Sequence, residues 1–155
     1  MNSQIGDIHI RAMNYLEVRP LRLEVLRAGM TNQTVDFDGD NEATTVHLGA
    51  FDETGVNIGV SSWMQRPFLP EPDLKAVQLR GMATVAHLQG QGIGGLLLAA
   101  GLKHAQENGF ALIWANARDA ALNFYNRHSF TTVGEGFIEP VTQLPHHKVV
   151  KYLLE

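Results

Sequence analysis

Short runs rich in hydrophobic residues, several of them alternating with polar positions, predict a chain with many β-strands. Residues 8–12 alternate in this way, which predicts a short strand at the edge of a sheet. Further strands are predicted at residues 44–51, 56–64, 76–85 and 110–115, with two more short strands near the C-terminal end. The segment Asp52-Glu53-Thr54-Gly55 is expected to join the second and third strands as a hairpin turn.

Three segments have helical signals instead. A first helix is predicted to begin at Pro20 and to end before Gly29. The segment 93–108 is apolar over much of its surface, which predicts a helix that packs on a sheet. Asp119 is expected to cap a third helix at residues 120–128. The order strand, helix, three strands, helix, strand, helix, strands predicts an α/β fold with a mixed sheet.

Length and composition favour an ordinary globular protein. The 155 residues fit one domain spanning residues 1–155, and the hydrophobic and charged shares are 45% and 18%. The net charge of −4 argues against nucleic-acid binding and is compatible with a cationic amine partner. With no cysteine, disulfides, zinc–thiolate sites and thiol nucleophiles are excluded. Residues 1–7 do not form a secretory signal and no apolar stretch reaches the ~20 residues of a membrane span, so we expect a cytoplasmic protein.

Glycines cluster just before the helix predicted at residues 93–108. They occupy positions 90, 92, 94 and 95. Glycine allows backbone amides to turn toward one point, and the start of a helix adds unpaired N–H groups and the positive end of its dipole. The turn therefore predicts a binding site for a phosphate or pyrophosphate that needs no lysine.

Two common phosphate-binding patterns fit this turn poorly. A nucleoside-triphosphate loop requires a Lys followed by Ser or Thr, which is missing here. The dinucleotide pattern G-x-G-x-x-G is met by Gly90, Gly92 and Gly95, but the next strand ends without the acid that would bind a ribose. A nicotinamide-dependent enzyme is therefore a weaker alternative. The scattered histidines and the segment 36–42 lack the spacing of a metal site, so none is expected.

Two segments resemble the GNAT superfamily of acyl-CoA N-acyltransferases. Gln89, Gly92 and Gly94 match its [Q/R]-x-x-G-x-[G/A] signature. The segment 117–130, A-R-D-A-A-L-N-F-Y-N-R-H-S-F, resembles the family's A-R-x-x-A-x-x-F-Y-x-x-x-G-F, with Ser129 in place of glycine. The resemblance implies a central mixed, largely antiparallel sheet of six to seven strands flanked by helices.

The resemblance also implies acetyl-CoA as co-substrate and assigns residues to it. The turn would hold the pyrophosphate, and the end of the preceding strand would bind the pantetheine arm, with the amide of Ala83 or Thr84 facing the thioester oxygen. Asn116 and Asn123, which flank the second motif, are further candidates. The full set of predicted cofactor-binding residues is Met82, Ala83, Thr84, Gln89, Gly90, Gln91, Gly92, Ile93, Gly94, Gly95, Asn116 and Asn123.

By the resemblance, a neutral primary amine attacks the thioester directly and the thiolate leaves. Tyr125 matches the family's tyrosine, which would protonate the departing sulfur; packing beside Phe124 is the alternative. Glu139 and His146 lie in a segment similar to an F-x-E…P-H stretch of some bacterial members and are candidate bases, or else solvated loop residues. The alternative function is a non-catalytic acyl-CoA sensor or partner-binding module on the same fold.

The acceptor is expected to be a small-molecule or peptide amine. Its pocket would be built by the loops at 31–41 and 65–73, and a homodimer is a further expectation from the family. Arg22 and Arg27 are predicted on the solvent-exposed face of the first helix. The acidic segment 36–42 is predicted to be a solvated surface loop, and attraction of a cationic acceptor is the alternative interpretation.

Overall fold

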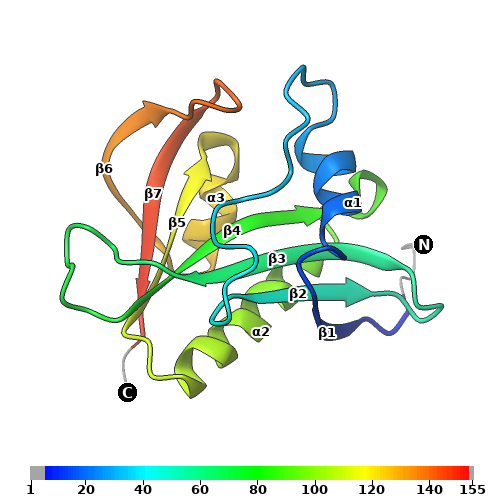
Figure 1. Ribbon diagram of the computed structural model, residues 1–155, viewed down its shortest axis with the longest axis horizontal. Helices are drawn as coiled ribbons and strands as arrows, with labels where there is room; N and C mark the ends of the chain where they lie inside the picture. Colours follow the sequence, from blue (N-terminus) through cyan, green and yellow to red (C-terminus); the bar gives the residue numbers. More distant parts are fainter. Residues whose placement is uncertain (1–5, 154–155) are drawn as a thin grey trace. The chain divides into compact units, whose positions relative to one another are not determined.

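The computed structural model describes residues 6–153 and contains seven strands and three α-helices there (Figure 1). Residues 1–5, part of the N-terminal stretch considered for a signal, and residues 154–155 lie outside the described part. The strands are β1 (His9–Met13), β2 (Val46–Phe51), β3 (Asn57–Gln65), β4 (Ala76–Thr84), β5 (Leu112–Arg118), β6 (Thr131–Ile138) and β7 (Pro145–Tyr152). The α-helices are α1 (Arg19–Leu21), α2 (Ile93–Glu107) and α3 (Leu122–Arg127), with shorter helical turns at Arg22–Leu26, Ala86–Leu88 and Asp119–Ala121.

The strands form one sheet in the order β1-β2-β3-β4-β5-β7-β6. The pairs β1–β2, β2–β3, β5–β7 and β6–β7 are antiparallel, while β4 and β5 are parallel. The strand predicted at residues 8–12 is indeed at an edge of the sheet, as β1. The predicted mixed, largely antiparallel sheet of seven strands with helices is therefore confirmed.

Contacts within the chain define two compact units. The first comprises residues up to Trp63 together with Gly81–Gly101, and the second comprises Met64–Arg80 together with the residues from Leu102 onward. The chain passes from one unit to the other within β3, β4 and α2. In the first unit β1, β2 and β3 lie side by side, and in the second β5 lies beside β7 and β7 beside β6 (Figure 1).

The core of the first unit forms where α2 packs on β3. Ile93 and Leu97 of the helix belong to the same buried cluster as Ile58 and Val60 of the strand. The contact is close because Gly59 has no side chain: a Cβ there would lie 3.0 Å from Ile93 and 3.1 Å from Leu97. The prediction that this apolar helix packs on a sheet is thus confirmed.

The core of the second unit is built around β5. Phe68, Trp114 and Val150 are buried together, and the indole N–H of Trp114 donates to the carbonyl of Arg66 at 3.0 Å. The parallel ladder between β4 and β5 joins three positions, from Ala76↔Leu112 to Gln78↔Trp114. Within the described residues of this unit, β4 continues beyond Gln78 and β5 continues beyond Trp114. The residues that follow these two positions are not paired with one another in the sheet.

Asp119 does not cap the third helix. The first residues of that segment form a 3₁₀ turn, α3 has no side-chain cap, and the Asp119 carboxylate instead accepts a hydrogen bond from His147. Ser129, which occupies the family's glycine position, adopts φ 71°. The backbone thus retains the left-handed conformation that glycine takes most easily, at a cost of about 1 kcal/mol for serine.

The prediction that Arg22 and Arg27 lie on a solvated helix face is wrong. Arg22 is fully buried and Arg27 is 6% exposed. The Arg22 guanidinium binds both carboxylate oxygens of Asp40, at 2.7 and 3.0 Å, and lies 4.1 Å above the Phe37 ring. Asp40 is therefore buried as well, although the acidic segment was predicted to be a solvated surface loop. A periodic pattern alone does not reveal a distant carboxylate that can neutralise a buried arginine.

Candidate functional site

The glycine-rich turn has the backbone conformation that its sequence requires. Gly90 and Gly92 have φ of 83° and 89°, a region that side chains with a Cβ rarely adopt. A Cβ at either position would meet no atom within 4 Å, so the turn faces open space. The side-chain amide of Gln89 donates to the carbonyl of Thr84 at 3.1 Å and braces the loop against the end of β4.

The start of α2 supplies backbone donors next to this turn. The N–H of Leu96 donates to the carbonyl of Gly92 at 3.1 Å, which is an i to i−4 helical bond. The N–H groups of Ile93, Gly94 and Gly95 precede it and have no acceptor within the helix. Because the first turn carries no acidic side chain, the positive end of the helix dipole is not neutralised locally. The turn and the helix start together are suited to a phosphate group.

The end of β4 leads into the turn. Gly81 has φ 62°, which interrupts the regular strand before Met82, Ala83 and Thr84. Ala83 is buried while Met82 and Thr84 are half-buried. The first unit thus brings together the predicted residues from Met82 to Gly95 along one continuous strand, turn and helix.

Tyr125 lies in the second unit, on α3. Its ring is 8% exposed and packs edge-on against Phe124 and Phe130, each with ring centroids 5.3 Å away. Burial raises the pKa of the Tyr125 hydroxyl to about 12. Among the described residues no hydrogen bond to this hydroxyl is present. The side chain is therefore a protonated phenol at neutral pH whose hydroxyl remains available as a donor.

His146, at the start of β7, is buried rather than a solvated loop residue. Its Nδ1 lies 2.9 Å from the carbonyl of Leu144, and because a carbonyl only accepts, this nitrogen carries the hydrogen. In the neutral ring Nε2 is then the proton acceptor. The ring also lies against Phe137, with centroids 5.8 Å apart. The geometry thus leaves one basic nitrogen.

Glu139 lies on the hairpin between β6 and β7. Its carboxylate accepts a hydrogen bond from the backbone N–H of Thr142 at 2.7 Å. Partial burial alone would raise the pKa of Glu139, but hydrogen bonds from the Thr142 and Val141 amides and the nearby His146 outweigh it, and the net pKa is lowered. A carboxylate held in its ionised form is a weak proton acceptor.

Both predicted asparagines are exposed. Asn123 lies on α3, and the Oδ1 of Asn116 on β5 accepts a hydrogen bond from the Lys148 ammonium at 2.8 Å. Lys148 was missed by the sequence analysis because nothing in the local pattern of β7 marks it. His146 lies two residues before Lys148 and therefore on the same face of β7. The Nδ1 of His147, between them, lies 2.7 Å from the Asp119 carboxylate.

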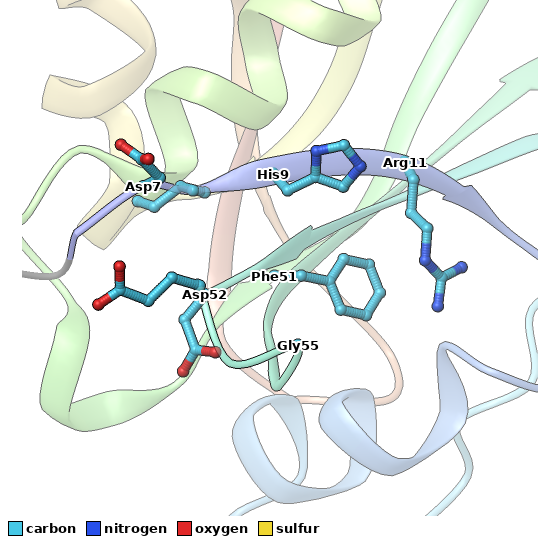
Figure 2. Close-up of a pocket in the computed structure, with 8 residues that line it drawn as sticks. Asp7, His9, Arg11, Phe51, Asp52 and Gly55 are labelled. Atoms are coloured by element: carbon cyan, nitrogen blue, oxygen red, sulfur yellow. The ribbon is translucent and has the colours of Figure 1, made fainter.

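A shallow hollow lies elsewhere, beside β1 and the β2–β3 turn (Figure 2). The Arg11 guanidinium lies 4.1 Å above the Phe51 ring there, and the Asp52 carboxylate accepts hydrogen bonds from Thr54 and Val56. The residues that line this hollow include none of the predicted site residues. In residues 6–153 there is no group of three or more acidic or histidine side chains placed to hold a metal ion. No helix in that range has the length and apolarity to cross a membrane.

Comparison with known proteins gives a consistent result. The model of the acetyltransferase (GNAT) family matches residues 10–130. A Bacillus subtilis protein described as the uncharacterized N-acetyltransferase YitI is 28% identical over 138 residues, which is 86% of this chain and 89% of that protein. Similar solved structures include an acyl-CoA N-acyltransferase from Pseudomonas aeruginosa, with a TM-score of 0.74, 20% identity and coverage of 94% and 99%. Escherichia coli ElaA has a TM-score of 0.75, 17% identity and the same coverage. At 20% and 17% identity, these two structures show that the fold is shared and nothing more.

Proposed function

Because the chain belongs to the GNAT family of acetyltransferases, we propose that it transfers the acetyl group of acetyl-CoA directly to a primary amine. The observation that carries this proposal is the turn before α2, in which Gly90 and Gly92 have positive φ, open space around them and helix-start amides beside them. These residues fit a pyrophosphate without any lysine. The match over residues 10–130 also supports a single GNAT domain for residues 1–155.

The cofactor-binding role divides between the turn and the strand before it. Backbone amides from Gln89 to Gly95 would bind the pyrophosphate of coenzyme A. The backbone of Met82, Ala83 and Thr84 would bind the pantetheine arm, and the amide of Ala83 or Thr84 would donate to the oxygen of the thioester carbonyl. Such a donor stabilises the negative charge that develops when the amine attacks. Asn116 and Asn123 remain proposed contacts to the cofactor.

The proposed proton transfers involve His146, Glu139 and Tyr125. His146 would accept the proton of the attacking amine at Nε2, since its Nδ1–H is held by the Leu144 carbonyl. Glu139, ionised beside it, would favour the imidazolium that results. Tyr125 would donate its proton to the thiolate as the carbon–sulfur bond breaks, so that amide and free thiol are the products.

The cofactor-binding turn can be tested with two matched glycine substitutions. Gly92→Ala is expected to weaken acetyl-CoA binding at least tenfold, because the new Cβ enters the open space and disfavours the φ that aims the amides. Gly55→Ala is the control, since Gly55 has the same φ of 89° and the same open surroundings but lies in the β2–β3 hairpin. Both variants should lose about 1 kcal/mol of folding stability. Isothermal titration calorimetry with acetyl-CoA measures the difference, and equal affinities would contradict the assignment.

A further inference from the structure

Lys148 on β7 places an ammonium group between aromatic rings in the second unit. Its Nζ lies 5.0 Å from the centre of the Trp114 ring and 5.4 Å from that of Phe137. One hydrogen bond, 2.8 Å long, joins it to the Asn116 Oδ1. The side chain is half-buried, whereas lysine usually extends its charge into water.

The two aromatic rings interact with this ammonium, but no carboxylate does among the described residues. Within the described residues Lys148 forms no salt bridge; the Asp119 carboxylate pairs with His147, and the Glu139 carboxylate accepts from the Thr142 amide. Burial lowers the pKa of Lys148, and no neighbouring carboxylate opposes this effect. A half-buried charge without a counter-ion is costly, so such groups are found where they bind a ligand.

The surroundings define the chemistry of a suitable ligand. An ammonium has three donors, and only one of them is used by Asn116. Trp114 and Phe137 flank the charge with apolar ring faces, which suit an apolar or aromatic group attached to the anion. An ammonium forms short, charge-assisted hydrogen bonds with a carboxylate.

We propose that Lys148, held in place by its hydrogen bond to Asn116, binds a carboxylate of the acceptor, so that the amine substrate is an amino acid or a similar carboxylate-bearing amine with an apolar side chain. This inference rests on the proposed acetyltransferase function and specifies its substrate class. Lys148 acts here as a specificity-determining residue, whereas the half-buried Phe137 ring would contact the apolar part of the substrate.

The test compares two ligands that differ only in the carboxylate. N-acetyl-L-phenylalanine, a product of the proposed reaction, and N-acetylphenethylamine are titrated into the full-length protein with coenzyme A present. We expect the first to bind at least tenfold more tightly, and Lys148→Met to abolish this difference, as for a lost charge-assisted hydrogen bond. Lys148→Arg should retain it in part. Equal affinities in the unsubstituted protein, or an unchanged preference in Lys148→Met, would overturn the inference.

Lys75→Met provides a matched control for loss of a lysine over an aromatic ring. Lys75 lies 4.6 Å from the centre of the Phe110 ring and donates to the Asn108 carbonyl at 2.7 Å, so its contacts resemble those of Lys148. This variant should retain the preference for the carboxylate ligand. Thermal unfolding distinguishes a structural role: Lys148→Met should keep or raise the melting temperature, because an apolar residue replaces an unbalanced charge. A fall in melting temperature with equal loss of both ligands would mean that Lys148 only supports the fold.

The inference and the proposed function can fail separately. The binding experiment does not require turnover. A preference for the carboxylate ligand that depends on Lys148 therefore supports the inference even if no amine is acetylated. The absence of acetylation would refute only the proposed function. Conversely, acetylation of L-phenylalanine and phenethylamine with equal kcat/KM, unchanged in Lys148→Met, would support the acetyltransferase and overturn the carboxylate site.

Discussion

Burial makes the Tyr125 hydroxyl a weaker acid than an exposed tyrosine. The ring is enclosed by Phe124 and Phe130, and desolvation of the phenolate raises its pKa to about 12. The group therefore keeps its proton throughout the neutral range, as a proton donor to a departing thiolate must. The same ring also packs against its aromatic neighbours. The packing interpretation made from the sequence is therefore compatible with the general-acid interpretation, because the first concerns the ring and the second the hydroxyl.

Substitution of Tyr125 by phenylalanine separates these two roles. Tyr125→Phe should lower kcat about a hundredfold if the hydroxyl is the general acid, because proton transfer of this kind contributes at least that factor. Acetyl-CoA affinity and melting temperature should stay nearly unchanged, since the ring remains and the hydroxyl has no hydrogen bond among the described residues. Steady-state kinetics and calorimetry measure both. A variant with full turnover would assign Tyr125 to packing alone.

The two adjacent histidines differ in orientation and provide a second residue-level test. A general base must be unprotonated to accept the proton of the amine, so kcat/KM of the unsubstituted enzyme should rise with pH until the base is deprotonated. His146→Ala should remove this rise and lower kcat/KM. His147→Ala is the control, because that ring is paired with Asp119. A pH profile that keeps its rise in His146→Ala would exclude His146 as the base.

At the scale of elements, the segment between α1 and β2 is fixed by a buried polar network. Arg22 also donates to the carbonyl of Val35 at 2.7 Å and to the Ser62 hydroxyl at 2.8 Å. His47 lies 2.6 Å from that hydroxyl and 2.9 Å from the Asp40 carbonyl, so its Nε2 carries the hydrogen and its Nδ1 accepts from Ser62. The loop predicted to face the acceptor is thereby joined to β2 and β3 through buried side chains.

Removal of the carboxylate should show how much this network contributes. Asp40→Asn leaves a buried guanidinium without a counter-ion and should cost about 3 kcal/mol of folding stability near neutral pH. Asp36→Asn, in the same loop, is the control, since its ion pair with Arg19 is exposed and is worth less than about 1 kcal/mol. Urea unfolding of the three proteins measures both values. Equal stabilities of the two variants would contradict a stabilising network.

The same pair predicts a dependence on pH. Burial alone would raise the pKa of Asp40, but hydrogen bonds from Arg22 and the Phe37 amide and the Arg22 charge outweigh it and lower the pKa below the ordinary value of 3.8. A lowered folded-state pKa means that the stabilisation is complete above the unfolded-state pKa and is lost as pH falls through the folded-state pKa. The stability difference between the unsubstituted protein and Asp40→Asn should therefore be constant above about pH 5 and shrink below pH 4.

At the scale of the whole molecule, family membership and sheet topology agree. The family match covers residues 10–130, and the strands adopt the mixed, mostly antiparallel order that the resemblance implied. Element bounds shift by only a few residues: the strand predicted at 76–85 is β4 at Ala76–Thr84, and the helix predicted at 93–108 is α2 at Ile93–Glu107. The identity of the acceptor is not fixed at this scale, because one fold serves many substrates.

Local features followed from the sequence, because they depend on a few adjacent residues. Only glycine takes φ near 85° without strain, so Gly90 and Gly92 fixed the shape of the turn, and the spacing of apolar residues fixed α2 and most strands. Long-range partners were decided by the tertiary structure. Arg22 meets Asp40 across 18 positions, His147 meets Asp119 across 28 and Lys148 meets Asn116 across 32. These contacts depend on the strand register and on the connections that bring distant segments together. No local pattern encodes which polar side chains will be neighbours in the folded chain.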